Sequence, residues 1–165
     1  MPASGVWNFL QWVHYLALVL WAGGITFLAG IAAPAIHRSM ASRAVAGEIV
    51  GTMLRRFNIL EIICALVLLV TSLFARHFIF ERKSWLLAIV LMVMTMGILT
   101  SVYSFHLTPR MQALKEKIPT LDALSASNPV KLEFDHLHTV YVKLMSFNLV
   151  LGLAVLYGSV VIFRP

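Results

Sequence analysis

Charged residues are scarce in this sequence. Asp, Glu, Lys and Arg make up only 12% of its 165 residues, whereas hydrophobic residues make up 60%. Soluble domains contain about 25% charged residues, and a small fold leaves much of its surface exposed, so it cannot hide this much apolar area from water. The composition therefore excludes an ordinary soluble enzyme and predicts an integral membrane protein.

Cysteine is almost absent as well. The single cysteine, Cys64, lies within an apolar run, which excludes an internal disulfide, a Cys-x-x-Cys zinc or redox motif and covalent attachment of c-type haem. The sequence also has no Gly-rich phosphate-binding loop and no His-Glu-x-x-His motif, and no apolar run contains paired carboxylates. Any haem in this protein must therefore be held non-covalently.

Four long apolar runs are present, at approximately residues 6–36, 58–76, 85–106 and 138–163. At a rise of about 1.5 Å per residue, helices of this length cross a hydrocarbon core of about 30 Å, although the second run is somewhat short. Backbone groups in lipid must bond within their own segment, which favours helices. We therefore predict one all-α transmembrane domain over residues 1–165, a four-helix bundle with both termini on the same side.

Basic residues predict how this bundle is oriented. Nine of the 13 Lys and Arg residues fall on the side of the two longer loops, and four fall on the other side. Because cytoplasmic loops carry an excess of positive charge, the long loops are expected in the cytoplasm and the termini in the periplasm of a bacterial inner membrane. The formal charge of +6 is thus interpreted as membrane topology, and no nucleic-acid partner is expected. The nine are Arg38, Arg43, Arg55, Arg56, Arg110, Lys115, Lys117, Lys131 and Lys143, and the four are Arg76, Arg82, Lys83 and Arg164.

A few polar residues lie inside the apolar runs, where an unpaired ionisable group costs several kcal/mol. Glu61 is near the start of the second run and Lys143 near the start of the fourth, at the same expected depth. An ion pair between them is geometrically possible, and the alternative is that Lys143 extends to the membrane interface. Asn148 lies deeper and is expected to need a partner on another helix. These three residues form a predicted polar centre.

Histidines near the ends of the runs suggest a cofactor. His14 and His77 are expected near one membrane surface, and His106 and His138 near the other. Two such pairs on adjacent helices resemble the arrangement by which helix bundles hold b-type haem. Trp21 lies on nearly the same face as His14, and Gly24 follows with other small residues that let a helix or a flat ligand approach closely. The alternative is that these histidines only form interfacial hydrogen bonds.

Met92, Met94 and Met96 raise the possibility of copper, because thioether and imidazole ligands suit Cu(I). A spacing of two residues, however, places Met94 on the opposite side of a helix from the other two. Methionine is also a common packing residue in apolar helices. Copper is therefore an alternative cofactor to haem b.

Several motifs resemble known membrane families. The segment from Val13-His14 through Trp21-Ala22-Gly23-Gly24 to Ala33-Pro34 is similar to the first helix of CopD-like copper-resistance proteins and HemJ-type protoporphyrinogen oxidases. A second set of motifs extends over nearly the whole chain, namely Ala46-Gly47-Glu48-Ile49-Val50-Gly51, Arg55-Arg56-Phe57, Pro109-Arg110, Phe134, His138 and Asn148. With these motifs the chain more closely resembles the transmembrane-protein-205-like, DUF4149-type family of unknown function.

These resemblances imply a four-helix membrane domain in which His14, His138, Pro109 and Arg110 match family positions, and haem b is bound by the related HemJ-type proteins. His77, His106 and Lys143 do not match, and the asparagine of the fourth helix is displaced relative to His138. His14 and His138 are expected near opposite surfaces, so a single haem would need a site between subunits or a non-histidine second ligand.

The leading functional prediction is a homo-oligomeric membrane cytochrome b for electron transfer or redox sensing, with a redox protein or quinone as partner. One alternative is a transporter of copper, another metal or a small molecule, in which the histidines, methionines and polar centre line a path. Others are a HemJ-like porphyrinogen oxidase and a scaffold whose polar groups only fix helix packing. The electron-transfer role makes a substrate-converting enzyme the less favoured prediction.

Overall fold

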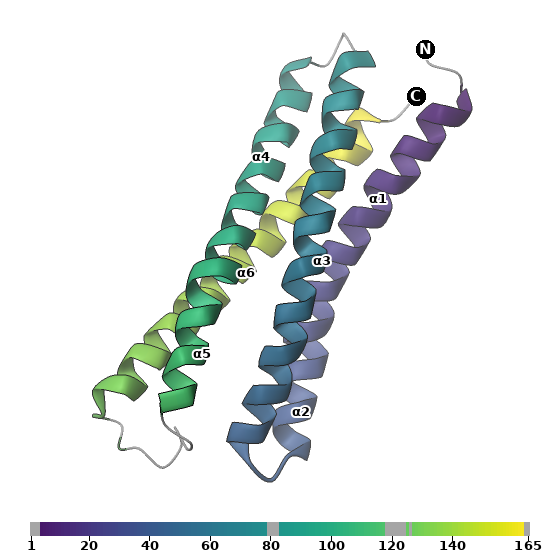
Figure 1. The fold of residues 1–165 in the computed structure, drawn as a ribbon. Helices are drawn as coiled ribbons and strands as arrows, with labels where there is room; N and C mark the ends of the chain where they lie inside the picture. Colours follow the sequence, from purple (N-terminus) through teal and green to yellow (C-terminus); the bar gives the residue numbers. More distant parts are fainter. Residues whose placement is uncertain (1–3, 79–82, 118–124, 126, 164–165) are drawn as a thin grey trace.

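The structure, a computed structural model, describes residues 4–78, 83–117, 125 and 127–163. These residues are almost entirely helical, and no strand is found among them. Four helical rods lie side by side (Figure 1). The first comprises α1 (Ser4–Phe27), η1 (Leu28–Ala32) and α2 (Ala33–Ser39); the second is α3 (Arg43–Phe78); the third comprises α4 (Lys83–Val102), η2 (Tyr103–Leu107) and α5 (Thr108–Lys117); the fourth is α6 (Pro129–Ile162).

Each rod is long and apolar enough to cross a membrane. Around the bundle α1 contacts α3, α3 contacts α4, α4 contacts α6, and α6 returns to α1. The two ends of the described chain meet, since the Trp7 and Phe163 rings lie 5.6 Å apart and the Gln11 side chain donates to the Phe163 carbonyl at 3.2 Å. The predicted all-α four-helix membrane bundle, with both termini on one side, is thereby confirmed.

The rods are longer than the apolar runs because helix continues into both predicted long loops. Residues 43–57 belong to α3, and α5 continues the third rod through residues 108–117. The fourth rod begins at Pro129, where the Asn128 side chain accepts a hydrogen bond from the Val130 amide at 3.0 Å. Proline at a first helical position after an asparagine cap is a favourable start for a helix.

Two prolines lie within these rods without ending them. Pro34 and Pro109 each follow a single π-helical turn, and the turn widens the backbone just before the proline. A proline has no amide hydrogen, and its ring collides with the carbonyl four residues earlier in a regular α-helix. A π turn changes the hydrogen-bond register locally, which accommodates this irregularity within a continuous rod.

Charged side chains mark out the part of the bundle that fits a bilayer. Along α3, Arg56 and Arg76 are 20 positions apart, and along α6 Lys143 lies 19 positions before the end at Ile162. Both separations correspond to roughly 30 Å of helix, the thickness of a hydrocarbon core. Large apolar side chains between these levels are exposed, such as Leu66 on α3 and Val150 on α6.

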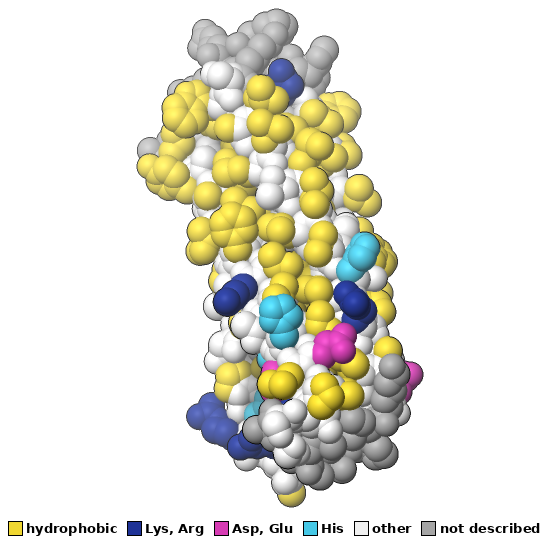
Figure 2. Space-filling model, turned by 90° about the vertical axis from the view of Figure 1, so that its left-hand side faces the viewer, with side chains coloured by type: hydrophobic (Ala, Val, Ile, Leu, Met, Phe, Trp, Pro, Cys, Tyr) yellow, Lys and Arg dark blue, Asp and Glu magenta, His cyan; other side chains and the backbone are white. Residues whose placement is uncertain are grey.

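The loop-side end of the bundle extends beyond this band. Figure 2 shows hydrophobic side chains over the upper part of one face and most of its charged and histidine side chains in the lower part. The first 13 residues of α3 precede Arg56, so about 20 Å of this helix projects past the hydrocarbon core. The protein therefore has a membrane-embedded part and a more polar end formed by α2, α5 and the adjoining halves of α3 and α6.

Candidate functional site

Among the residues that the structure describes, eight polar residues are buried in the bundle interior, all at most 6% exposed. Burying a polar group without a partner is costly, so such groups in a membrane bundle are functional candidates. They form two groups that lie at different depths, which we call the Glu61 cluster and the His14 cluster. The Glu61 cluster comprises Asn58, Glu61, Thr100 and Asn148 with the phenols of Tyr103 and Tyr141, and the His14 cluster comprises His14, Thr71 and Ser159 with the neighbouring Ser72.

Tyr103 is the centre of the Glu61 cluster. Its hydroxyl donates to Glu61 Oε1 at 2.7 Å. The Asn148 amide donates to the same hydroxyl at 3.0 Å, and the Thr100 hydroxyl lies 2.9 Å away. Because the Tyr103 hydroxyl donates its proton to Glu61, its oxygen accepts from the other two groups. Accepting these hydrogen bonds makes the hydroxyl a stronger donor to Glu61. Residues from α3, α4, η2 and α6 thus meet at one hydroxyl group.

This cluster retains unused hydrogen-bonding capacity. Glu61 is completely buried, yet its Oε2 has no hydrogen-bond partner, and Asn148 Oδ1 has none either. Among the described residues, no Lys or Arg forms an ion pair with Glu61. A buried carboxyl group with a free oxygen is a site at which a proton or a cation can be bound.

A second layer of the cluster lies one turn toward the loop side. The Tyr141 hydroxyl donates to Asn58 Oδ1 at 3.2 Å, and the Tyr103 and Tyr141 rings meet edge-on with centroids 5.2 Å apart. Asn58 precedes Glu61 by three residues on α3, so both face the interior. Aromatic rings and polar groups therefore surround the loop-side approach to Glu61.

The His14 cluster lies toward the opposite membrane surface. His14 is 1% exposed, with Nδ1 2.8 Å from the Thr71 hydroxyl and Nε2 2.9 Å from the Ser159 hydroxyl. The Phe163 ring covers it edge-on with centroids 5.3 Å apart. Both ring nitrogens are therefore occupied by hydroxyl groups of neighbouring helices.

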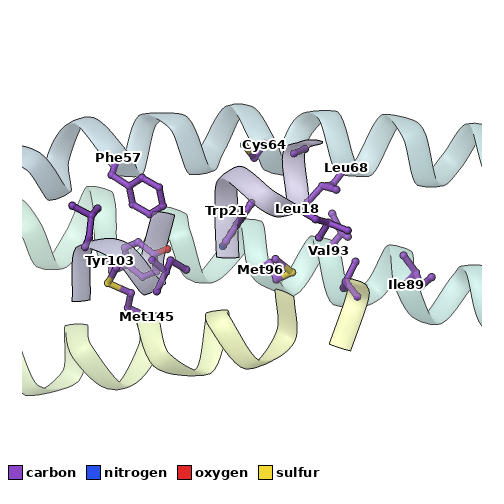
Figure 3. Packing of buried hydrophobic residues seen from close by; sticks show 14 of the residues in the cluster. Leu18, Trp21, Phe57, Cys64, Leu68, Ile89, Val93, Met96, Tyr103 and Met145 are labelled. Atoms are coloured by element: carbon purple, nitrogen blue, oxygen red, sulfur yellow. The ribbon is translucent and has the colours of Figure 1, made fainter. Parts of the chain in front are cut away.

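An apolar layer separates the two clusters. Glu61 and Thr71 are ten residues apart on α3, which corresponds to about 15 Å along the helix. Figure 3 shows the side chains that fill this interval, including Leu18, Trp21, Leu68 and Met96, each at most 1% exposed. The interior is thus closed between two polar regions.

The predicted polar centre is formed only in part. The structure brings Glu61 and Asn148 together through Tyr103, so the predicted interhelical partner of Asn148 exists. Lys143, however, is exposed on the outer surface of α6, and the possible ion pair with Glu61 is absent. A lysine at this level can reach the membrane interface with its long side chain. The position of Lys143 therefore fits the alternative prediction, in which it extends to the interface, and not the ion pair.

The predicted histidine pairs are not assembled in the described part of the chain. His106 and His138 are both exposed, and no described contact joins them; His138 instead stacks on Phe134, with centroids 6.2 Å apart. His77 belongs to α3, but its side chain lies outside the described residues. The described partners of His14 are Thr71 and Ser159.

Trp21 and Gly24, predicted as cofactor contacts, instead take part in helix packing. Trp21 is completely buried in the apolar layer, and its indole Nε1 has no described partner. Gly24 lies against the Phe57 ring of α3, and a Cβ at this position would collide with that ring. The missing side chain of Gly24 therefore allows α1 to approach α3 closely.

In this packing the described residues around His14 leave no room for haem or copper. The space beside His14 is too small to hold even a water molecule, and both nitrogens of that ring are already hydrogen-bonded. No group of three or more His, Cys, Asp or Glu residues that suits a metal ion is found among them. Of the three methionines, Met96 is buried and Met94 is exposed, as the helical spacing predicts.

Five hydroxyl-bearing partners were not anticipated from the sequence, namely Thr71, Thr100, Tyr103, Tyr141 and Ser159. Hydroxyl residues within apolar runs bond to their own helix backbone, as the Thr71 hydroxyl also does with the Val67 carbonyl at 2.8 Å, so they give little signal. The sequence contains one usable indication of this network. Asn58 is, like Asn148, a side-chain amide, and it lies three residues before Glu61 at the start of the second apolar run.

A comparison with protein families gives a match over most of the chain. The family described as a domain of unknown function, DUF4149, matches residues 16–119, which is more than half of the chain. The chain belongs to the DUF4149 family. The comparisons with curated proteins and with solved structures found no match.

The match confirms the predicted DUF4149-type resemblance, whereas no relation to CopD-like or HemJ-type proteins is shown. The matched DUF4149 segment contains Glu61, Thr100 and Tyr103, and it ends before Asn148. The core of the Glu61 cluster thus lies within the family domain, while His14 precedes it.

Proposed function

We propose that this DUF4149 protein is a proton-coupled membrane transporter in which Glu61 is the group that binds the proton. The observation that carries the proposal is the complete burial of Glu61 with Oε2 unpartnered and no described cation beside it. Ionisable residues inside membrane bundles are rare, and they mark ion and substrate pathways. The transporter alternative from the sequence is therefore the one that this geometry supports best.

The positions of the two clusters are consistent with a transporter that exchanges solutes, and not with an open channel. Polar groups approach Glu61 from the loop side and His14 from the other side, and about 15 Å of packed apolar side chains separates them. The side chains of this apolar layer, such as Leu68 and Met96, are completely buried. Passage of a solute would accordingly require rearrangement of the helices around the apolar layer, as in alternating access.

The chemistry around Glu61 favours an organic cation as the exchanged solute. A free carboxylate oxygen attracts positive charge, and the Tyr103 and Tyr141 rings beside it offer faces that bind cations. A proton and a cation compete for the same carboxyl group. Protonation on one side of the membrane would therefore release the cation, which couples the two movements in opposite directions.

Uptake by proteoliposomes tests this function. Vesicles with an acidic lumen and encapsulated DNA would report ethidium entry by fluorescence. We expect uptake above that of protein-free vesicles for the native protein, the same uptake for Glu133→Gln, which changes an exposed glutamate, and only background uptake for Glu61→Gln. Equal uptake by the native protein and Glu61→Gln would refute the proposed role.

Haem b binding for electron transfer, redox sensing or porphyrinogen oxidation is a second proposal. It is supported by the resemblance of residues 13–34 to HemJ-type proteins and by the histidines near both ends of the spans. In the packing described above, His14 would have to leave Thr71 and Ser159 to ligate iron. An absorption spectrum of protein purified from haem-replete cells tests it, since the absence of a Soret band contradicts haem binding.

A further inference from the structure

A lateral groove lies between α1 and α3 on the outer surface of the bundle. It has a volume of about 540 Å³ and is lined almost entirely by apolar groups, within the range typical of small-molecule sites. The α1 wall includes Val19, Gly23 and Phe27, and the α3 wall includes Leu60. Val19 and Phe27 are more than half exposed, so the groove opens toward the surrounding lipid.

One charged side chain lines this groove. Arg56 is exposed beside Phe57 and Leu60. It makes no hydrogen bond or ion pair with any described residue, so its guanidinium is available to a ligand. An arginine can bind the oxygens of a phosphate with two parallel hydrogen bonds.

Arg56 also lies at the depth where lipid headgroups are found. It marks the loop-side boundary of the hydrocarbon band, about 30 Å along α3 from Arg76. Leu60 follows it by one helical turn toward the membrane interior, and Val19 and Gly23 form the facing wall. The groove thus has a cationic end at the interface and an apolar remainder within the hydrocarbon core.

We propose that this groove binds one anionic phospholipid, with its phosphate on Arg56 and an acyl chain along Gly23 and Leu60. Charge complementarity selects this occupant, because the groove carries one unpaired positive charge and no acidic side chain. The site is distinct from the Glu61 cluster, since Glu61 faces the bundle interior. Binding here would fasten α1 to α3 next to the Gly24–Phe57 contact.

Gly23 gives this site a matched pair of steric variants. A Cβ at Gly23 would meet nothing within 4 Å, and the same is true of Gly30, which does not line the groove. Gly23→Leu therefore fills the groove without disturbing the packed core. Gly30→Leu adds the same side chain on the same rod at a place outside the groove.

Native mass spectrometry of the detergent-purified protein tests the proposal with phosphatidylglycerol and phosphatidylcholine of identical acyl chains. We expect the native protein to bind phosphatidylglycerol about tenfold more tightly, because both lipids offer a phosphate to Arg56 but the choline of phosphatidylcholine places a second positive charge beside it. Arg56→Gln should abolish the preference, Arg56→Lys should restore part of it, and Arg110→Gln, which changes another exposed loop-side arginine, should leave it unchanged. Gly23→Leu should weaken binding of both lipids, whereas Gly30→Leu should not.

Three results would overturn this assignment. One is an unchanged lipid preference in correctly folded Arg56→Gln protein, judged by its thermal midpoint. Another is an equal loss of preference in Arg110→Gln, which would indicate attraction by the overall positive charge. The third concerns the oligomeric state. If the native protein is a dimer, and Gly23→Leu is a monomer that binds lipid as before, then the occupant of the groove is a second copy of the chain.

Discussion

The hydroxyl group of Tyr103 determines how Glu61 is held in the bundle. It donates to Glu61 and accepts from Asn148 and Thr100, so one oxygen atom connects α3, α4, η2 and α6. Its position at the start of a π-helical turn fits the frequent occurrence of such turns at functional sites. The Glu61 cluster is therefore both a structural junction and the candidate proton-binding site.

Removal of this hydroxyl is expected to destabilise the protein. Tyr103→Phe leaves the buried Glu61 Oε1 without its hydrogen-bond donor and removes one of the acceptors of the Asn148 amide, which costs about 1–3 kcal/mol. The same change at Tyr157, which is 75% exposed, should alter the stability by less than about 0.5 kcal/mol. The free energy of unfolding of both variants, measured in mixed detergent micelles, checks this prediction, and equal stabilities would contradict it.

At the residue scale, the sequence predicted which groups are costly to bury but not which groups satisfy them. Glu61, Asn148 and His14 were identified because polar groups are expensive in apolar helices. Their partners depend on how each helix is rotated about its axis, and one sequence contains no direct record of that rotation. Tyr103 and His106 are three residues apart, yet Tyr103 is buried and His106 is exposed.

At the scale of elements, the contact between α1 and α3 depends on a missing side chain. Gly24 accepts the Phe57 ring directly against its backbone, and small residues permit this approach in membrane bundles. The predicted role of Gly24 was contact with a flat ligand, and the flat group that occupies this place is a phenylalanine of the same chain.

A larger residue at position 24 should therefore separate these helices. Gly24→Leu is expected to cost about 1–3 kcal/mol of stability through overpacking, and Phe57→Ala in the same protein should recover part of the loss by making room. Gly23→Ala, the control on the neighbouring position, should be neutral or slightly stabilising, because alanine favours helix over glycine. Thermal unfolding of the native protein, Gly24→Leu, Phe57→Ala, the double variant and Gly23→Ala tests this, and additive losses in the double variant would argue against direct contact.

For the whole molecule, apolar composition and run length predicted the architecture correctly. The apolar runs placed the four spans but not the full length of the rods, because polar helix beyond the bilayer follows no long apolar run. The helical spacing of Val45, Ile49 and Met53 does indicate the extension of α3, whereas no pattern indicated that of the third rod. The projecting end is held together by contacts that the sequence does not indicate, such as Lys115 Nζ donating to the Gly47 carbonyl at 3.1 Å while lying 5.4 Å from the Phe134 ring centre.

The extent of the hydrocarbon band can be mapped with cysteine labelling. In a Cys64→Ala background, Val45→Cys should react with a membrane-impermeant maleimide, because it lies on the projecting part of α3 and is exposed. Leu66→Cys, also exposed on the same helix, should not react, because lipid covers it. Labelling of Val45→Cys only in inside-out vesicles is the result expected from the predicted cytoplasmic loops, and labelling only in right-side-out vesicles would reverse the orientation.

The central claim is that Glu61 takes up and releases a proton inside the bundle. Infrared difference spectroscopy of the reconstituted protein between acidic and alkaline pH measures this directly, through the carbonyl stretch of a protonated carboxyl group. The account predicts a buried-carboxyl band that disappears in Glu61→Gln and persists in Glu133→Gln. Identical carboxyl bands in the native protein and Glu61→Gln would contradict it.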